Sequence, residues 1–395
     1  MKAPRIFLIA GEASGDALGA ALMRALRLAR PDASFIGVGG EAMAREGLVS
    51  LFPLADIAVM GLAPVIRRLP KLIARINETA RAVIAAQADC LVLIDAPDFT
   101  HRVARKVRRE RPRMPIVDYV SPTVWAWRPG RAKAMRAYVD CVLALMPFEP
   151  EAHERLGGPR CVYVGHPLVE RLDELTRYAP LEGNESGEPG DASRRDRPLL
   201  LVLPGSRVAE VQRMTPLYGE TLKLLMRERP DLEVAIPVAP NMERTLRDAL
   251  RDWPLAPRLI TQQEKFAAFR NARAALVTSG AATLELALAG TPMAVAYKVS
   301  PAESLLRFLI EVDSIVLPNL VIGENAIPEF LQEAATPRAV ADAIASLLED
   351  GAARARQLSA FARVRERLSE AGDNPSARAA QIVLQYVDGR ESAAG

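Results

Sequence analysis

The residues best suited to chemistry gather in two turns of the second half of the chain. The first turn lies in VTSGAATLE, which places Ser279, Gly280, Thr283 and Glu285 behind a short apolar strand. The first backbone N–H groups of a helix lack intrahelical partners and suit an anion such as a pyrophosphate. Glu285 stands where a carboxylate accepts bonds from ribose hydroxyls in dinucleotide folds. The alternative is an ordinary turn in which Ser279 caps the helix.

The second turn follows an apolar strand in LLLVLPGSRVAE. There Gly205, Ser206 and Arg207 begin a helix, so backbone N–H groups and a guanidinium converge on one point. An arginine fork suits a bidentate contact with a phosphate group. Because both turns follow strands of the same kind of sheet, they predict a two-sided diphosphate cradle, and the pair is a stronger signal than either turn alone.

A candidate general base stands in the first half of the chain. The run CLVLIDAPDFT delivers Asp95 at the end of a buried strand, with Asp98 three residues later. A carboxylate in a loop at a strand end is placed for general-base work. Asp95 is the better candidate because the strand itself delivers it. As an alternative, both acids are turn-formers that bond to their own backbone.

The first strand of the chain also ends in a polar turn. GEASGDALGA places Glu12 and Ser14 at a helix entry but lacks the full G-x-G-x-x-G fingerprint, so a dinucleotide site is not favoured. Loops at the carboxyl ends of parallel strands line the ligand crevice, which predicts that Glu12 and Ser14 face a ligand. The alternative is that Ser14 or Asp16 caps the helix.

An aromatic and basic loop, YVSPTVWAWRPGR, contains two of the three tryptophans of the chain, Trp125 and Trp127, with Arg128 and Arg131 beside them. Such a loop suits a sugar or an acyl chain and a phosphate contact. The alternative is that both tryptophans anchor the loop to the core.

Two polar side chains in turns are open to either interpretation. His166, in GHPL, faces a ligand or is a structural turn residue. Asn319, in LPNL, bonds a ligand through its amide or caps its own turn.

The sequence of Leu48 to Ile76 suggests a segment that lies at a membrane surface. Its apolar residues are followed at once by Arg67, Arg68, Lys71 and Arg75, a pattern that suits a lipid interface with anionic headgroups. The alternative is a buried helix with a solvated basic end.

The elements that must position these residues alternate between strand and helix. That alternation predicts parallel sheets with helices on both faces. The expected strands are Arg5–Ala10, Ser34–Val38, Cys90–Asp95, Pro115–Val120, Cys141–Leu145 and Cys161–Val164, then Leu199–Leu203, Leu232–Ile236, Arg258–Ile260, Ala274–Val277 and Met293–Tyr297.

The two series of strands predict two α/β domains with a cleft between them. Residues 181–197 hold almost no apolar side chain and read as a linker or insertion. The expected division is therefore 1–180, the linker, a second domain over 198–336, and packing helices over 337–395. In those helices Val340, Ile344, Leu347 and Leu348, then Ile382, Val383, Tyr386 and Val387, have helical apolar spacing.

Composition narrows the functional classes. A net charge of +3 in 395 residues argues against general nucleic-acid binding. Cys90, Cys141 and Cys161 are too few and too scattered for a disulfide framework or a zinc site, which indicates a reduced, cytosolic protein. The apolar N-terminus runs into a polar turn and reads as a strand, and no stretch approaches the ~20 apolar residues of a membrane span. Without an Asp-x-Asp motif or clustered histidines, no bound metal is implied.

Six of these motifs, in order, carry a family resemblance. GEASGD, DAPDF, YVSPTVWAWR, GHPL, LPGSR and SGAATLE closely resemble the lipid-A-disaccharide synthases, which are bacterial glycosyltransferases. The resemblance implies a GT-B-type fold of two Rossmann-like domains. It also implies an inverting transfer from UDP-2,3-diacylglucosamine to 2,3-diacylglucosamine 1-phosphate, which forms a β-1,6-linked disaccharide and releases UDP without a metal or other cofactor.

The resemblance assigns roles residue by residue. Asp95 matches the base for the acceptor's 6-hydroxyl, and Arg207 matches a UDP contact. Ser279, Thr283 and Glu285 match the nucleotide-binding turn, while Glu12 and Asn319 fall in further motifs with cleft-facing roles. Ala281 departs from the family, which often has Thr there. The resemblance also implies a cytoplasmic protein held peripherally at the inner membrane, and a homodimer in some members.

Two other functions use the same features. A UDP-sugar epimerase would share the nucleotide turn and turn over without an acceptor. A nucleotide-sugar sensor would bind the donor and perform no chemistry.

Overall fold

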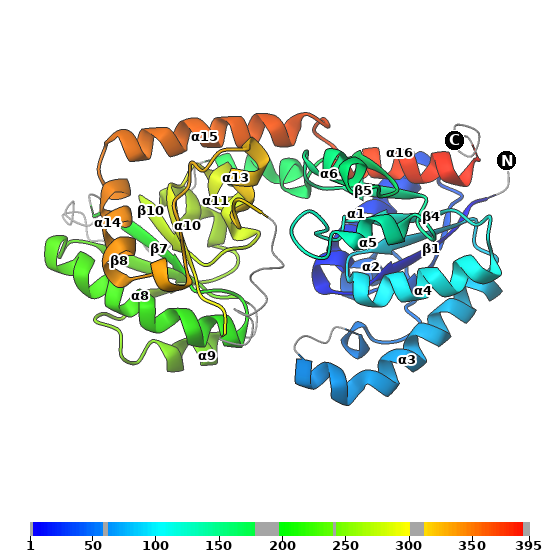
Figure 1. Cartoon of the computed structure of the whole chain (residues 1–395), viewed down its shortest axis with the longest axis horizontal. Coiled ribbons are helices and arrows are strands. Elements are labelled where there is room, and N and C mark those ends of the chain that lie inside the picture. The colour runs from blue at the N-terminus through cyan, green and yellow to red at the C-terminus, as the bar shows by residue number, and fades with distance from the viewer. Residues whose placement is uncertain (1–2, 58–61, 178–196, 240–241, 301–311, 390–395) are drawn as a thin grey trace. The chain divides into compact units, whose positions relative to one another are not determined.

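The computed structural model describes residues 3–57, 62–177, 197–239, 242–300 and 312–389, with the backbone alone for 62–68. The chain divides into two compact units (Figure 1). The first comprises Met1–Glu170 together with Ser369–Gly395, and the second comprises Arg171–Leu368. The expected linker falls almost entirely outside the described residues, and the expected cleft stays a prediction.

The first unit is built on a six-stranded parallel sheet in the order β2-β1-β3-β4-β5-β6. Strands β1 and β3 are buried at nearly every position, as expected for parallel strands covered on both faces. Along β1, Phe7 and Ile9 join one core cluster while Ile6 and Leu8 join the other. The strands are β1 Arg5–Ala10, β2 Ser34–Val38, β3 Cys90–Ile94, β4 Ile116–Tyr119, β5 Cys141–Ala144 and β6 Arg160–Tyr163.

The second unit repeats the architecture with a parallel sheet in the order β12-β11-β10-β7-β8-β9. Strands β7 and β10 are neighbours at its centre, in register from Leu200 and Ala274 to Leu203 and Val277. The strands are β7 Leu199–Leu203, β8 Glu233–Pro237, β9 Arg258–Ile260, β10 Ala274–Val277, β11 Met293–Tyr297 and β12 Glu329–Leu331.

Helices cover the faces of each sheet (Figure 1). In the first unit they are α1 Ala13–Ala29, α2 Glu41–Arg45, η1 Leu54–Asp56, α3 Leu62–Ala85, α4 Pro97–Glu110, α5 Gly130–Met135, α6 Glu149–Arg155 and α16 Pro375–Val387, with η2 Pro167–Arg171 at the boundary. In the second they are α7 Leu172–Thr176, α8 Val208–Glu228, α9 Glu243–Ala249, α10 Lys265–Asn271, α11 Ala282–Ala289, α13 Leu317–Ile322, η5 Gln332–Ala334, α14 Pro337–Leu348 and α15 Ala352–Ser369.

The C-terminal helices do not form a separate layer. Helix α14 packs on α8 and buries Val340 and Ile344 in the core of the second unit. Helix α16 returns to the first unit and lies beside α1, where Ile382 and Val383 join the core that contains Ile6 (Figure 1). The observed division therefore differs from the expected one at 337–395, because the apolar face of α16 completes the first core.

The α/β class and the parallel sheets are confirmed, and all eleven expected strands form. Their ends differ by one residue at most, and the extra turn residues Asp95 and Val120 leave their strands with a positive φ. Strand β12 was not expected, because its three residues include a glutamate and show no apolar run.

Candidate functional site

Asp95 lies in a tight turn at the carboxyl end of β3. Its φ is +59° and that of Ala96 is +46°, so two residues other than glycine adopt the left-handed conformation in succession. The amide of Asp95 donates to the carbonyl of Tyr119 on β4 at 3.2 Å, and Thr100 Oγ1 donates to the carbonyl of Asp95 at 3.0 Å. Such conformations cost free energy and gather at functional sites. The surrounding bonds therefore hold Asp95 in a specific, strained position.

The carboxylate of Asp95 accepts two hydrogen bonds, one from the neighbouring residue and one from a distant segment of the chain. Oδ2 accepts from Ser14 Oγ at 3.0 Å, and Oδ1 accepts from the amide of Ala96 at 2.7 Å. The second bond is local, as the turn-former alternative requires, but the first joins the turn to the β1–α1 segment. The structure thus brings two of the predicted residues of the first unit together.

Glycines make that contact sterically possible. A Cβ on Gly11 would lie 2.1 Å from Cβ of Ala96, and one on Gly15 would lie 3.0 Å from the carbonyl oxygen of Ile94. Neither glycine has a positive φ, so close approach is what requires them. The two glycines of GEASGD therefore lie where this segment packs closely against the turn that holds Asp95.

The helix-cap alternative for this motif is wrong for both residues. Glu12 occupies the N-cap position of α1, with no side-chain cap bond. Ser14 bonds Asp95, and the buried Asp16 accepts amide bonds from α2 instead, at 2.7 Å from Gly40 and 2.8 Å from Ala42. Asp16 is therefore structural. Glu12 is half-buried, and its ligand role stays a prediction.

The tryptophan loop is fixed by a buried polar cluster that the sequence interpretation missed. Trp125 Nε1 donates to Oε1 of Glu149 at 3.1 Å, and its ring meets Phe148 edge-on at 5.0 Å. Oε2 of Glu149 accepts from the amides of Leu145 and Met146 at 3.1 and 3.0 Å. Burial raises the pKa of Glu149 to about 7. The anchor alternative is confirmed for Trp125, and the only sequence signal was a glutamate in the first turn of α6.

In the second unit, the turns after β7 and β10 lie at one sheet edge, as predicted, because the two strands are hydrogen-bonded neighbours. Gly205 has a φ of +112° and leads into α8, whose N-cap is Arg207. The Arg207 side chain is 59% exposed and its Nη1 donates to Glu210 Oε1 at 2.9 Å, while Glu210 Oε2 accepts from the amide of Ser206 at 3.2 Å. The Glu210 carboxylate therefore accepts from the same groups that were expected to donate to a phosphate.

Around β10 the predicted residues divide into two kinds. Gly280 is exposed, has a φ of +137°, and has nothing within 4 Å of where a Cβ would lie. Thr283 is fully buried and Oγ1 donates to the carbonyl of Gly280 at 2.7 Å, while Ser279 Oγ donates to the carbonyl of Ile315 at 2.7 Å. Ser279 therefore does not cap α11, whose N-cap is Ala281. These two hydroxyls hold the turn that leaves the backbone at Gly280 open.

Glu285 has a partner that the sequence interpretation did not include. Because α11 begins at Ala282, Glu285 lies in its first turn. Its Oε2 lies 2.6 Å from Nζ of Lys265, at the start of α10, and its side chain is 15% exposed. The predicted ribose contact is therefore already paired with a lysine.

Asn319 and His166 each bond the backbone of their own turn, which is the structural one of the two alternatives for each residue. The amide of Asn319 is buried, and Oδ1 accepts from the amides of Ala326 and Ile327 at 3.1 and 3.0 Å, which closes the turn after α13. This side chain is not exposed to a ligand in the structure, and its cleft-facing role stays a prediction. His166 Nδ1 accepts from the amide of Leu168 at 3.2 Å.

The expected membrane segment is only partly an exposed apolar surface. Leu48, Phe52 and Ile57 are buried, and the basic side chains of Lys71 and Arg75 pair with Asp56 at 2.6 and 2.5 Å. Exposed apolar side chains along it are Val49, Leu51, Leu69 and Ile73. Residues 58–61 and the side chains of 62–68, including Val59, Met60, Leu62, Val65, Ile66, Arg67 and Arg68, lie outside the described structure.

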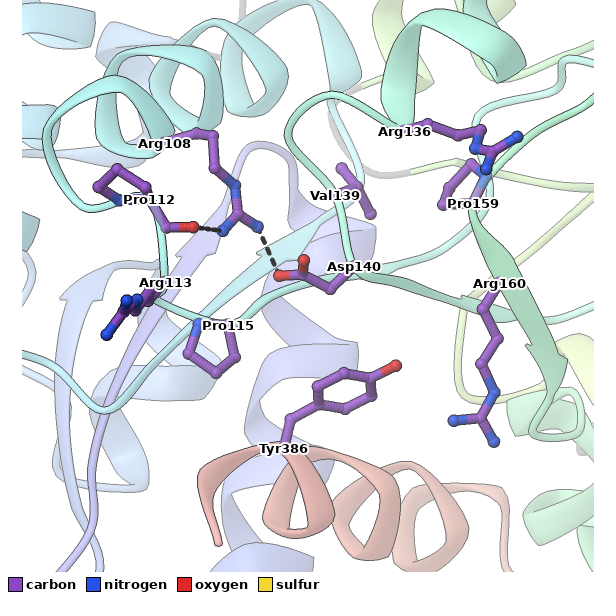
Figure 2. A pocket seen from close by; sticks show the side chains of 10 residues that line it. All are labelled: Arg108, Pro112, Arg113, Pro115, Arg136, Val139, Asp140, Pro159, Arg160 and Tyr386. Carbon is purple, nitrogen blue, oxygen red and sulfur yellow. Dashed lines mark hydrogen bonds and ion pairs between the residues drawn. The ribbon is translucent and has the colours of Figure 1, made fainter. Parts of the chain in front are cut away.

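A cavity of about 950 Å³ lies at the other edge of the first sheet, where β4, β5 and β6 begin. Arg108 Nη2 donates to Asp140 Oδ2 at 2.5 Å, and Arg108 Nη1 donates to the carbonyl of Pro112. Figure 2 shows both bonds, with Tyr386 of α16 forming another wall. None of the predicted site residues lines it. Because ligands of parallel α/β sheets bind at the carboxyl ends of the strands, we assign no substrate to this cavity.

Comparison with solved structures identifies the fold as the GT-B type. UDP-GlcNAc 2-epimerase from Neisseria meningitidis has a TM-score of 0.61 at 11% identity, covering 96% of this chain and 98% of that one. MurG from Acinetobacter baumannii has a TM-score of 0.55 at 12% identity, covering 97% and 100%. These likenesses show the fold, which epimerases and transferases share.

Sequence comparison defines the family. The family model described as lipid-A-disaccharide synthetase matches residues 6–383. The lipid-A-disaccharide synthase of Nitrobacter hamburgensis is 53% identical over 386 residues, covering 96% of this chain and 95% of that protein, and the one from Rhodospirillum centenum is 43% identical, covering 99% and 96%. The chain belongs to the lipid-A-disaccharide synthase family.

Proposed function

We propose that the chain transfers the 2,3-diacylglucosaminyl group of UDP-2,3-diacylglucosamine to the 6-hydroxyl of 2,3-diacylglucosamine 1-phosphate. Family membership supports this reaction and favours it over the UDP-sugar epimerase alternative. The observation that carries the chemistry is Asp95, which two left-handed residues and the bond from Ser14 hold at the end of β3.

The proposed reaction is a single in-line displacement. Asp95 accepts the proton of the 6-hydroxyl while that oxygen forms a bond to the anomeric carbon of the donor. The bond between that carbon and the UDP oxygen breaks, UDP leaves with the electron pair, and the configuration inverts to β. Positioning of the two sugars and general-base catalysis supply the acceleration.

The leaving diphosphate needs stabilisation of its negative charge. In the proposal, the Arg207 guanidinium and the amides near Ser206 bind it from the β7 side, and the open backbone at Gly280 binds it from the β10 side. Glu210 then has to give up Arg207, since both anions need the same donors. Glu285 binds the ribose hydroxyls, with Lys265 beside it.

The proposal also covers the metal requirement, the location of the protein and its oligomeric state. The transfer proceeds without a metal; among the residues that the structure describes, no three His, Cys, Asp or Glu side chains gather as a metal site would require. The protein works at the cytoplasmic face of the inner membrane, in contact with lipid through Leu51, Leu69 and Ile73. It forms a homodimer. Across the described residues, no helix is long and apolar enough to cross a bilayer.

The test is to incubate the purified protein with both acylated substrates and a chelator, and to measure UDP and disaccharide. The proposal predicts equal amounts of both products, with no loss on chelation. Conversion of the donor into another UDP-sugar without the acceptor would favour an epimerase, and UDP release without the acceptor would favour a hydrolase. Binding without turnover would favour a sensor, and loss of activity on chelation would contradict the metal-free step.

A further inference from the structure

The loop from Ser121 to Arg131 presents one arginine that no described carboxylate neutralises. Arg128 is exposed, and its guanidinium lies 5.4 Å from the ring centroid of Trp127. Its φ is +55°, which is rare for a residue other than glycine and costs free energy. The nearby Arg131 differs, because its Nη2 bonds Asp98 at 3.0 Å and its side chain is 18% exposed.

This loop is tied down on both sides of Arg128. Before it, Ser121 Oγ lies 2.8 Å from Nε2 of the buried His153, and Trp125 donates to Glu149. After it, Arg131 bonds Asp98, in the first turn of α4. An anchored loop loses little conformational entropy when it binds a ligand, so the strained arginine is held ready for one.

The position of the loop decides which substrate it can meet. It follows β4, whose last residue Tyr119 accepts the amide bond of Asp95, so it leaves the sheet beside the proposed base. The ion pair with Asp98 joins it to the helix that begins two residues after Asp95. Arg128 therefore belongs to the same unit and the same sheet edge as the residue that activates the acceptor.

We propose that Arg128 is the specificity-determining cation for the phosphate group of the acceptor, and that Glu149 is the positioning residue that holds its loop. The inference rests on the proposed function, because it takes the acceptor to be a sugar 1-phosphate. A guanidinium matches a phosphate in charge and in hydrogen-bond geometry, and the cation–π contact with Trp127 restricts its position. The uncharged sugar without that phosphate gains nothing from Arg128.

The decisive variant is Arg128→Gln, which keeps the backbone strain and removes the charge. With 2,3-diacylglucosamine 1-phosphate, the acceptor KM is expected to rise about 10- to 100-fold, as for the loss of a charge-assisted bond, with the donor KM unchanged. With 2,3-diacylglucosamine the variant and the wild type are expected to be equal. Arg113→Gln is the matched control, an exposed arginine at the opposite sheet edge, with wild-type values expected.

The positioning role is tested by Glu149→Gln and Trp125→Phe. The glutamine oxygen can accept the two amide bonds of the β5–α6 turn, which leaves its NH₂ group facing the indole N–H of Trp125. Both variants are expected to raise the acceptor KM less than Arg128→Gln does, for the phosphorylated acceptor alone. Glu149→Gln is also expected to shift the tryptophan emission, to which Trp253 of the other unit contributes a constant background.

The outcomes separate the inference from the function on which it rests. If the wild type forms no disaccharide, the proposed function fails. If the wild type is active and Arg128→Gln leaves the acceptor KM unchanged, or raises only the donor KM, the assignment of Arg128 is overturned. If Glu149→Gln shifts the emission but affects both acceptors equally, Glu149 is not a positioning residue for phosphate recognition.

Discussion

The Glu210 carboxylate and the Arg207 guanidinium lie 2.9 Å apart at the start of α8, and the same carboxylate accepts the amide of Ser206. Glu210 is the third residue of the helix, where a glutamate commonly reaches back to cap it. It therefore uses the donors that the proposed diphosphate needs.

Replacing this carboxylate is expected to favour the donor. Glu210→Gln removes a competing charge, so UDP should bind about 3- to 10-fold more tightly, while the free energy of unfolding falls by about 0.5 to 1 kcal/mol through the weaker cap. Titration calorimetry with UDP and urea unfolding measure the two effects. Weaker UDP binding would mean that Glu210 helps to hold the nucleotide.

The bond between Ser14 and Asp95 predicts a catalytic defect with little effect on binding. Ser14→Ala removes the donor to Oδ2 and leaves the amide of Ala96 on Oδ1. A general base takes its proton in the transition state, so a misoriented Asp95 slows the reaction without weakening substrate binding. We therefore expect kcat to fall about 10-fold, with both KM values nearly unchanged. Steady-state kinetics with each substrate varied in turn measure kcat and both KM values. A raised acceptor KM at constant kcat would place Ser14 in substrate binding instead.

Gly11 predicts a steric effect on the same turn. In Gly11→Ala the new Cβ would meet that of Ala96, so the turn holding Asp95 must shift. We expect a loss of about 1 to 3 kcal/mol in the free energy of unfolding, together with reduced kcat. Gly351→Ala is the control, since its Cβ would meet nothing within 4 Å. Equal behaviour of the two variants would show that the close approach does not matter.

Glu149 predicts a pH dependence of stability. Burial raises the pKa of its carboxyl from 4.5 to about 7, so the folded state binds a proton that the unfolded state has lost between these values. This contribution is complete below pH 4.5 and is lost as the pH rises through 7, amounting to about 3 kcal/mol. The difference in unfolding free energy between wild type and Glu149→Gln should change by this amount from pH 4.5 to 8. A constant difference would contradict the raised pKa.

The fold was predictable because its strands are continuous apolar runs with polar turns at their carboxyl ends. Residues 6–10 and Ala274–Val277 are buried at every position, and such runs have few alternatives to a central parallel strand. The destination of α16 was not predictable, since an apolar helical face does not say which core it joins.

The position of a candidate residue was predictable where it lies in the turn that follows a strand, as for Asp95 after β3 and Arg207 after β7, while their roles stay predictions. The role of a polar side chain was less predictable where the residue could bond either a ligand or the backbone of its own turn. Thr283 and Asn319 both bond the local backbone, which the spacing of the sequence could not decide. Partners from distant segments, such as Lys265 for Glu285 and Glu149 for Trp125, were missed because only the folded sheet brings them together.

The role of Asp95 as the general base is tested by the turnover of Asp95→Asn with both substrates, measured beside its affinity for UDP. Asparagine fits the same turn but cannot take the proton of the acceptor hydroxyl. If Asp95 is the base, kcat is expected to fall by about 10²- to 10⁴-fold while UDP binding stays at the wild-type value. Turnover within a few-fold of the wild type would show that another group is the base.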